Sequence, residues 1–184
     1  MRIPLSGGPP ELVTTALQDA VFCSGPPAKL CVSAERTLDR KQAIFTSVDP
    51  IQGCGRELAR FPLDPTIDYF VFDLSPDGTR LAVSGNTQGP IHIVPLNGQP
   101  DQVIPIKFDD AQEFFWAADG KGLYVPDQHK KSTFLFHVDL HGRTRQLWEQ
   151  RGGGWMWARP SPDGHHLAIE SSTNSSNIWM MENF

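Results

Sequence analysis

Ser75-Pro76-Asp77-Gly78 is followed directly by Thr79-Arg80-Leu81-Ala82-Val83, and this phrase returns twice later in the chain. The later copies are Ala117-Ala118-Asp119-Gly120 with Lys121-Gly122-Leu123-Tyr124-Val125, and Ser161-Pro162-Asp163-Gly164 with His165-His166-Leu167-Ala168-Ile169. The turn aspartates Asp77, Asp119 and Asp163 are 42 and 44 residues apart. A repeat of that length, built from strands and tight turns, is typical of the blades of a β-propeller.

The Asp-Gly pairs Asp77-Gly78, Asp119-Gly120 and Asp163-Gly164 each predict a type I′ hairpin turn, because glycine adopts positive φ at low cost. Aspartate favours the same turn, since its carboxylate can bond the backbone two residues further on. A calcium site or acid–base catalysis is the alternative role for these aspartates. They lie on separate blades, so they cannot form one close carboxylate pair, and we assign them to turns.

Each repeat divides into predicted strands, which gives one domain over residues 1–184 with blades at about 16–62, 66–107, 112–150 and 154–184. The last blade ends after three strands, the third being Ile178–Phe184. Residues 1–15 are predicted to supply its outer strand, near Glu11 to Thr15, because Ile3–Gly8 resembles Val94–Gln99. Such closure removes exposed strand edges.

The sequence therefore predicts an all-β propeller of about four four-stranded blades. Two alternatives stay open: a small ring that closes on itself, or a fragment of a larger propeller whose earlier blades lie upstream. A start inside a strand favours the fragment.

Charge and hydropathy exclude several partner classes. The net charge of −5 and the pI near 5.6 argue against nucleic-acid binding, which usually needs a basic face. No apolar run approaches the ~20 residues of a membrane helix. The N-terminus also lacks the apolar stretch of a signal peptide. We expect neither a nucleic-acid partner nor a membrane segment for this chain.

The first repeat differs from the others at its first turn. It has Ser24-Gly25-Pro26-Pro27 where the others have a Pro-Asp-Gly type of turn, although Leu30-Cys31-Val32-Ser33 lines up with Leu81-Ala82-Val83-Ser84. Cys23 and Cys31 flank this hairpin. A disulfide between them is feasible if their Cα atoms lie within ~7 Å, and it would imply an oxidising compartment such as a periplasm. The alternative is a pair of buried reduced thiols.

The repeated phrase resembles the TolB-type, WD-like propeller repeat and is similar to the propellers of prolyl oligopeptidase-type peptidases. The ordered set of motifs extends from Cys31–Glu35 through Asp73–Gly78 and Trp116–Leu123 to Asn177–Phe184. This set resembles the C-terminal propeller of acidobacterial-type sensory proteins, which follows a serine/threonine kinase or winged-helix DNA-binding domain, often with a membrane segment between them.

The resemblance implies the sensor or scaffold part of a larger signalling protein, with the propeller periplasmic or extracytoplasmic if the parent is membrane-anchored. Expressed as given, the chain would be cytoplasmic. It contains no kinase motifs, so any kinase activity would belong to the full-length parent.

No catalytic or metal-binding set stands out. Gly-x-Ser-x-Gly, the nucleophile elbow of hydrolases, does not occur. Of the six histidines only His165 and His166 are adjacent, and neighbours on a strand point to opposite faces. We predict no catalytic residue, no metal and no cofactor.

The predicted function is a non-catalytic module that binds a protein, peptide or small ligand at the channel mouth, through residues that the sequence does not identify. The alternatives are the accessory propeller of a prolyl oligopeptidase-type hydrolase and a truncated fragment without activity. In Trp155-Met156-Trp157, alternate side chains are predicted to face opposite sides of the sheet, some packed inside and the others open to a partner.

Overall fold

The computed structural model describes residues 3, 6–12, 20–49, 51–111, 113–173 and 180. Over these residues the secondary structure consists of strands, turns and bends, without a helix. The strands form three four-stranded antiparallel sheets and one two-stranded sheet. The predicted all-β class is confirmed.

Each sheet is a meander in which strands consecutive in the chain pair with each other. Blade 1 holds β1 (Val21–Cys23), β2 (Cys31–Arg36), β3 (Gln42–Asp49) and β4 (Gly53–Pro62). Blade 2 holds β5 (Val71–Leu74), β6 (Arg80–Ser84), β7 (Ile91–Pro95) and β8 (Gln102–Ile104). Blade 3 holds β9 (Phe115–Trp116), β10 (Gly122–His129), β11 (Ser132–Asp139) and β12 (Thr144–Arg151). Blade 4 holds β13 (Gly153–Pro160) and β14 (Leu167–Thr173).

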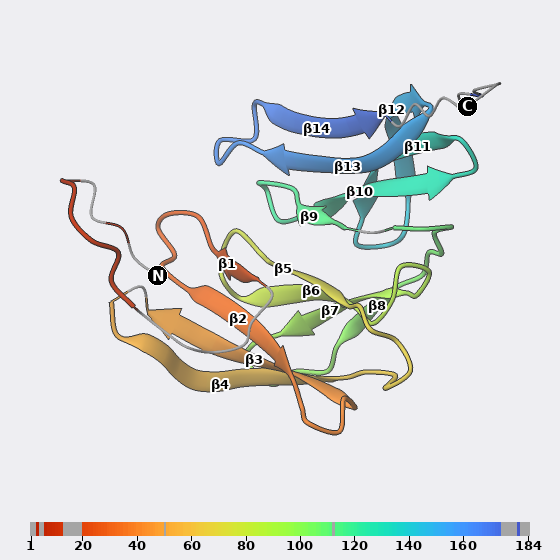
Figure 1. The fold of residues 1–184 in the computed structure, drawn as a ribbon. Coiled ribbons are helices and arrows are strands. Elements are labelled where there is room, and N and C mark those ends of the chain that lie inside the picture. Colours follow the sequence, from red (N-terminus) through yellow and green to blue (C-terminus); the bar gives the residue numbers. More distant parts are fainter. Residues whose placement is uncertain are drawn as a thin grey trace.

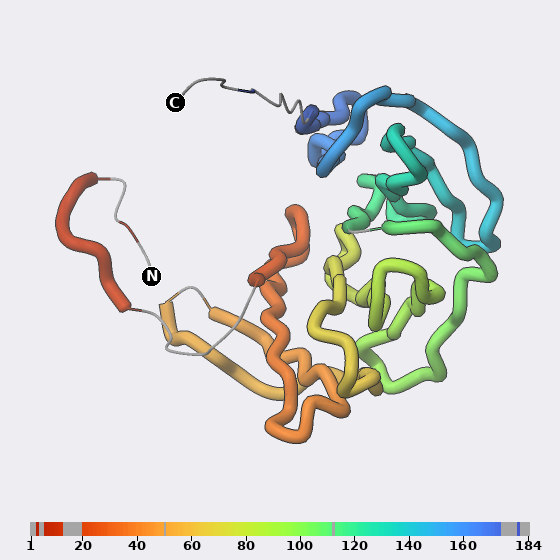
Figure 2. The backbone as a smooth tube through the Cα atoms, turned by 45° about the vertical axis from the view of Figure 1, so that its right-hand side comes forward, coloured from red at the N-terminus to blue at the C-terminus, as the bar shows by residue number. Residues whose placement is uncertain are grey.

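The blades stack side by side in chain order, as expected for a propeller (Figure 1). Their first strands meet on the inside, β1 against β5, β5 against β9 and β9 against β13. The backbone follows an arc, and over the described residues the sheet of blade 4 does not stack on the sheet of blade 1 (Figure 2). Residues 6–12 lie on the open side of this arc.

The hydrophobic core lies between the blades. In β6, Leu81 and Val83 pack toward blade 1, whereas Ala82 packs toward blade 3. All three are fully buried. Because both faces of an inner sheet are covered, its strands read as continuous apolar runs instead of alternating ones. In β13, successive side chains also face opposite sides of the sheet. Met156 is buried, whereas Trp155 and Trp157 are exposed, as predicted.

The Asp-Gly turns have a different geometry from the predicted type I′ hairpin. Gly78 has φ of 70° and its N–H donates to the Ser75 carbonyl over 2.8 Å, whereas Asp77 does not adopt positive φ. A type I′ turn needs positive φ at both central residues. Asp77 instead accepts hydrogen bonds from the Thr79 N–H (3.0 Å) and the Ser75 hydroxyl (2.6 Å), which fix the turn with only glycine in the left-handed region.

The alignment of the first repeat is wrong by one residue. Ser24 N–H donates to the Leu30 carbonyl, as Ser75 N–H does to the Arg80 carbonyl, so Cys31 corresponds to Leu81. The shift matters because a one-residue slip moves every side chain to the opposite face. The cross-strand pair Cys23–Cys31 thus occupies the place of Leu74–Leu81.

The predicted third strand of the last blade, Ile178–Phe184, falls outside the described residues apart from position 180, as does most of the strand predicted near Glu11 to Thr15. The described part of blade 4 is therefore β13 and β14. Completion of this blade by the N-terminus stays a prediction.

Candidate binding site on the inner strands

The turn phrase defines one equivalent position on each inner strand, four residues before the turn aspartate. Asp73, Phe115 and Arg159 occupy it in blades 2, 3 and 4. In blade 1 the corresponding residue is Phe22, which pairs with Val32 as Asp73 pairs with Ala82. Four residues from four blades thus have the same place in their hairpins, and they meet inside the arc.

Arg159 connects this set. Its guanidinium carbon lies 4.5 Å from the centroid of the Phe115 ring and 5.2 Å from that of Phe22. A cation over an aromatic face is attracted by the negative face of the ring. The arginine of blade 4 therefore contacts blades 3 and 1 together, although the residue itself is exposed.

Asp73 is the buried carboxyl of the set. Its Oδ2 accepts the Trp116 N–H over 2.8 Å and its Oδ1 accepts the Leu74 N–H over 3.0 Å. The Trp116 indole also donates to the Asp73 carbonyl at 3.2 Å. Burial raises the pKa of Asp73 to about 6, although the Trp116 N–H and the positive charge of Arg159 act in the opposite direction. Asp73 joins blade 2 to blade 3 at their inner edge.

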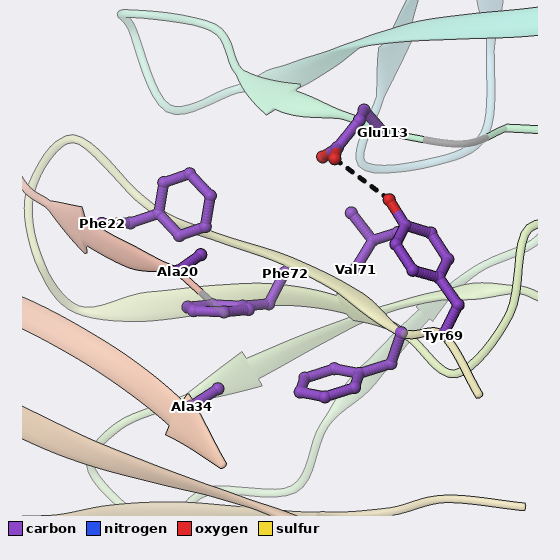
Figure 3. Close-up of a pocket in the computed structure, with 8 residues that line it drawn as sticks. Ala20, Phe22, Ala34, Tyr69, Val71, Phe72 and Glu113 are labelled. Carbon is purple, nitrogen blue, oxygen red and sulfur yellow. Dashed lines mark hydrogen bonds between the residues drawn. The ribbon is translucent and has the colours of Figure 1, made fainter. Parts of the chain in front are cut away.

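Glu113 and Tyr69 lie at the other end of the inner strands. The Tyr69 hydroxyl donates to Glu113 Oε1 over 3.0 Å, across the top of a small pocket of about 180 Å³ (Figure 3). Burial raises the pKa of Glu113, while the Tyr69 hydrogen bond and the charge of Arg159 oppose the rise. Phe22 and Ala20 enter the same pocket from the β1 side.

A larger cavity of about 420 Å³ opens where the inner strands end in their turns. All four blades line it, with Cys23, Ser24, Gly25, Pro26, Asp73, Leu74, Pro76, Phe115, Trp116, Ala118, Arg159, Pro160, Ser161 and Pro162. We call this cavity the channel mouth. Prolines and aromatic rings make much of its wall apolar, and Arg159 supplies its positive charge.

The serines of the channel mouth are engaged within their own hairpins. Ser24 Oγ donates to the Leu30 carbonyl and accepts the Leu30 N–H, both at 3.1 Å. Ser161 Oγ accepts the His166 N–H at 3.0 Å and donates to Asp163. No histidine lines this cavity within the described part of the chain, so its lining residues form no serine–histidine pair for nucleophilic catalysis.

The turn residues predicted from sequence stand at separate hairpins around this end of the arc. Asp119 and Asp163 also border a second, polar cavity of about 510 Å³ between blades 3 and 4. The Ser161 hydroxyl and the His165 N–H donate to Asp163 and lower its pKa. Among the described residues no cluster of histidine, cysteine and carboxylate side chains could hold a metal ion.

Cys23 and Cys31 lie opposite each other on β1 and β2, with their Sγ atoms 1.99 Å apart and their Cα atoms 3.9 Å apart. The pair borders the channel mouth through Cys23. In blades 2 to 4 the same cross-strand place holds the apolar pairs Leu74–Leu81, Trp116–Leu123 and Pro160–Leu167. In those blades the pair faces the preceding blade, whereas Cys23 faces the open side and is exposed.

Sequence reasoning missed the set of Phe22, Asp73, Phe115 and Arg159. Counting back four residues from each turn aspartate would have found three of the four. The signal was a charged residue at a place where an inner strand is otherwise apolar, since charged side chains are rarely buried without a partner.

No protein-family model matches the chain, and no curated protein sequence matches it. Its fold resembles that of several solved structures. TolB from Acinetobacter baumannii aligns with a TM-score of 0.65 and 19% identity over 95% of this chain and 43% of that one. Hydrazine synthase from Kuenenia stuttgartiensis aligns with a TM-score of 0.55 and 12% identity over 90% and 46%. A periplasmic gluconolactonase, PpgL, from Pseudomonas aeruginosa aligns with a TM-score of 0.48 and 16% identity over 92% and 70%.

At these identities the likeness shows the fold alone, a β-propeller of the TolB type. The chain spans less than half the length of TolB and of hydrazine synthase. Nowhere in the described residues is there a helix with the length and hydropathy to cross a membrane.

Proposed function

We propose that this chain is a non-catalytic binding module whose ligand docks at the channel mouth. The observation that carries the proposal is the cavity of about 420 Å³ to which all four blades contribute, with the exposed Arg159 in its wall. Its volume falls in the range of about 300–1,000 Å³ found for ligand pockets. The serines of the wall are occupied by turn hydrogen bonds, which favours recognition over nucleophilic chemistry.

We also propose that the module is the sensor or scaffold part of a larger signalling protein, with a kinase or winged-helix domain elsewhere in the parent. The resemblance of the ordered motifs supports this. Cys23 and Cys31 are paired across β1 and β2, and a disulfide between them would support a periplasmic or extracytoplasmic place.

A peptide selection followed by hydrogen exchange tests the binding function. A library of short peptides with free C-termini is selected against the folded chain, and the enriched peptides are used to map slowed amide exchange. We expect protection of residues 23–26 and 158–162, the turn ends of the inner strands in blades 1 and 4. Failure to enrich any peptide would rule out a peptide ligand, and protection confined to the outer strands β4, β8 and β12 would overturn the proposal.

The non-catalytic part needs its own measurement. The chain is incubated with lactone, ester and peptide substrates, and product is quantified against a heat-unfolded sample. We expect no turnover above that background. Turnover that Arg159→Gln or Asp73→Asn abolishes would place an active site at the channel mouth and contradict the proposal.

A further inference from the structure

The exposed guanidinium of Arg159 lines the channel mouth. Among the residues that the structure describes, no carboxylate or carbonyl accepts a hydrogen bond from it. Phe115 and Phe22 hold it only through their ring faces, at 4.5 and 5.2 Å from the centroids. The rings position the cation, yet they satisfy none of its five N–H donors.

Arg80 also lies over an aromatic ring, but its guanidinium has a hydrogen-bond acceptor within the protein. Its guanidinium carbon lies 4.8 Å from the centroid of the Trp116 ring, and its Nη2 donates to the Gly120 carbonyl over 3.0 Å. Arg80 is half-buried between blades 2 and 3. Arg159 has no such acceptor among the described residues, and it lines the cavity instead.

The two nearby carboxyls, Asp73 and Glu113, accept their hydrogen bonds from groups other than Arg159. Both oxygens of Asp73 already accept backbone N–H groups, from Trp116 and Leu74. Glu113 accepts the Tyr69 hydroxyl. These carboxyls act on Arg159 through their charge alone. Their negative charge disfavours a doubly charged anion, such as phosphate, more strongly than a singly charged one.

The wall beside Arg159 is apolar. Leu74, Trp116 and Phe115 are buried residues whose edges reach the cavity, and Pro76, Pro160 and Pro162 complete this side. An apolar group next to the anion would bury its surface against this wall, at roughly 25 cal/mol per Å² of apolar area.

We infer that the channel mouth binds a monocarboxylate that carries an adjacent apolar group. The carboxylate is received by the planar guanidinium of Arg159, whose N–H fork matches two carboxylate oxygens. The apolar group packs against the prolines and Trp116. A peptide C-terminus with an apolar last residue and a small free carboxylic acid share this chemistry. The inference rests on the proposed binding function, because it names the ligand class of the same site.

Calorimetric titration with four probes tests the inference. The probes are N-acetyl-Ala-Phe as the free acid, the same dipeptide as its C-terminal amide, 3-phenylpropionate and inorganic phosphate, each taken into the millimolar range. We expect the free acid to bind at least about tenfold more tightly than the amide, a difference of about 1.4 kcal/mol, and phosphate not to bind. Tighter binding of the dipeptide acid than of phenylpropionate would assign the site to a peptide terminus; equal binding would assign it to a small acid.

Substitutions connect the binding to Arg159. Arg159→Gln should weaken the free acid at least about tenfold, and Arg159→Lys should recover part of the loss, because lysine keeps the charge without the planar fork. The matched control is Arg151→Gln, whose side chain is 90% exposed at the end of the outer strand β12. It should bind as the unchanged protein does. Circular dichroism checks that every variant keeps its fold.

Three results would overturn the inference. The first is equal affinity for the free acid and the amide, the second is unchanged affinity in Arg159→Gln, and the third is no saturable binding of any carboxylate probe. Each of them leaves the proposed binding function intact if the selected peptides still protect the channel mouth from exchange. Both ideas fail together only if that protection is absent as well.

Discussion

The interface between blades 2 and 3 and the inner wall beside blade 4 contain the same pair of groups, an arginine over an aromatic ring. At the interface, Arg80 lies over Trp116 and its hydrogen bond goes to a backbone carbonyl of the next blade. At the inner wall, Arg159 lies over Phe115 and faces a cavity. The pair holds two blades together where packing surrounds it, and it is available to a ligand where packing leaves it exposed.

We expect the largest difference in unfolding free energy between substitutions of two tryptophans, Trp116 at the interface and Trp157 on blade 4. Trp116 is 3% exposed, and both its backbone N–H and its indole donate to Asp73. Trp116→Ala should lower the free energy of unfolding by about 3–5 kcal/mol, because it leaves a cavity and removes an indole donor. Urea denaturation measures this loss. The control is Trp157→Ala, 47% exposed on β13, which should cost about 1 kcal/mol or less. Equal losses would mean that the two regions do not differ in packing.

The interface should also respond to pH through Asp73. Its pKa is about 6 in the folded protein and 3.8 in the unfolded chain, so the folded state holds the proton more tightly between these values. The free energy of unfolding should therefore fall as pH rises from about 4 to about 6, by up to about 3 kcal/mol, with the full loss present above pH 6.

Urea unfolding across this range, compared with Asp73→Asn, isolates the contribution of Asp73. The variant should lack this part of the slope. Asp163→Asn, at an exposed turn, serves as the control and should keep it. A slope that survives in Asp73→Asn would assign the titration to another group.

On the open side of the channel mouth, the unfolding free energy should depend on a disulfide between Cys23 and Cys31. If Cys23 and Cys31 are joined, the bond closes a loop with a sequence separation of 8, and its reduction should cost about 2–3 kcal/mol of unfolding free energy. Denatured, unreduced protein should then show one reactive thiol of the three cysteines. Cys54→Ser should remove that thiol and keep the effect of reduction. Three reactive thiols before reduction would refute the bond.

We expect the smallest difference in unfolding free energy between substitutions of the two arginines, Arg80 and Arg159. Arg80→Gln should cost about 1–2 kcal/mol, because it removes a cation–π contact and a hydrogen bond in a half-buried place. Arg159→Gln should cost about 1 kcal/mol or less, since the exposed guanidinium has only its ring contacts and no acceptor among the described residues. Thermal unfolding of the two variants compares them directly. A larger loss at Arg159 would show a structural role in holding blades 1, 3 and 4 together.

Much of the fold could be predicted from the turn phrase. The predicted strand Arg80–Ser84 agrees with β6, and most other predicted strands agree within a few residues of their ends. The errors are local. The alignment of Leu30–Ser33 was off by one because Ser24–Pro27 offers no Asp-Gly to count from, and the turn type was wrong because the Asp77 side chain supports a turn that needs positive φ only at Gly78.

The candidate site could not be predicted in the same way. Asp73 and Arg159 are 86 residues apart, and no local pattern joins them. Sequence reasoning took the turn aspartates as the recurring feature, although they serve their own hairpins. The residues that meet in the channel mouth lie four positions earlier, where the repeat does not conserve a residue type: phenylalanine, aspartate, phenylalanine and arginine.

Short-range chemistry in the chain thus determined where it turns, which segments extend and that these segments form repeated sheets, because glycine φ preference and side-chain alternation act over a few residues. Only the tertiary structure decided that one arginine would stand over rings from two other blades, with a cavity before it and two carboxyls nearby. That outcome depends on how the blades pack, since the curvature of the arc brings together positions that the sequence separates by a full repeat or more.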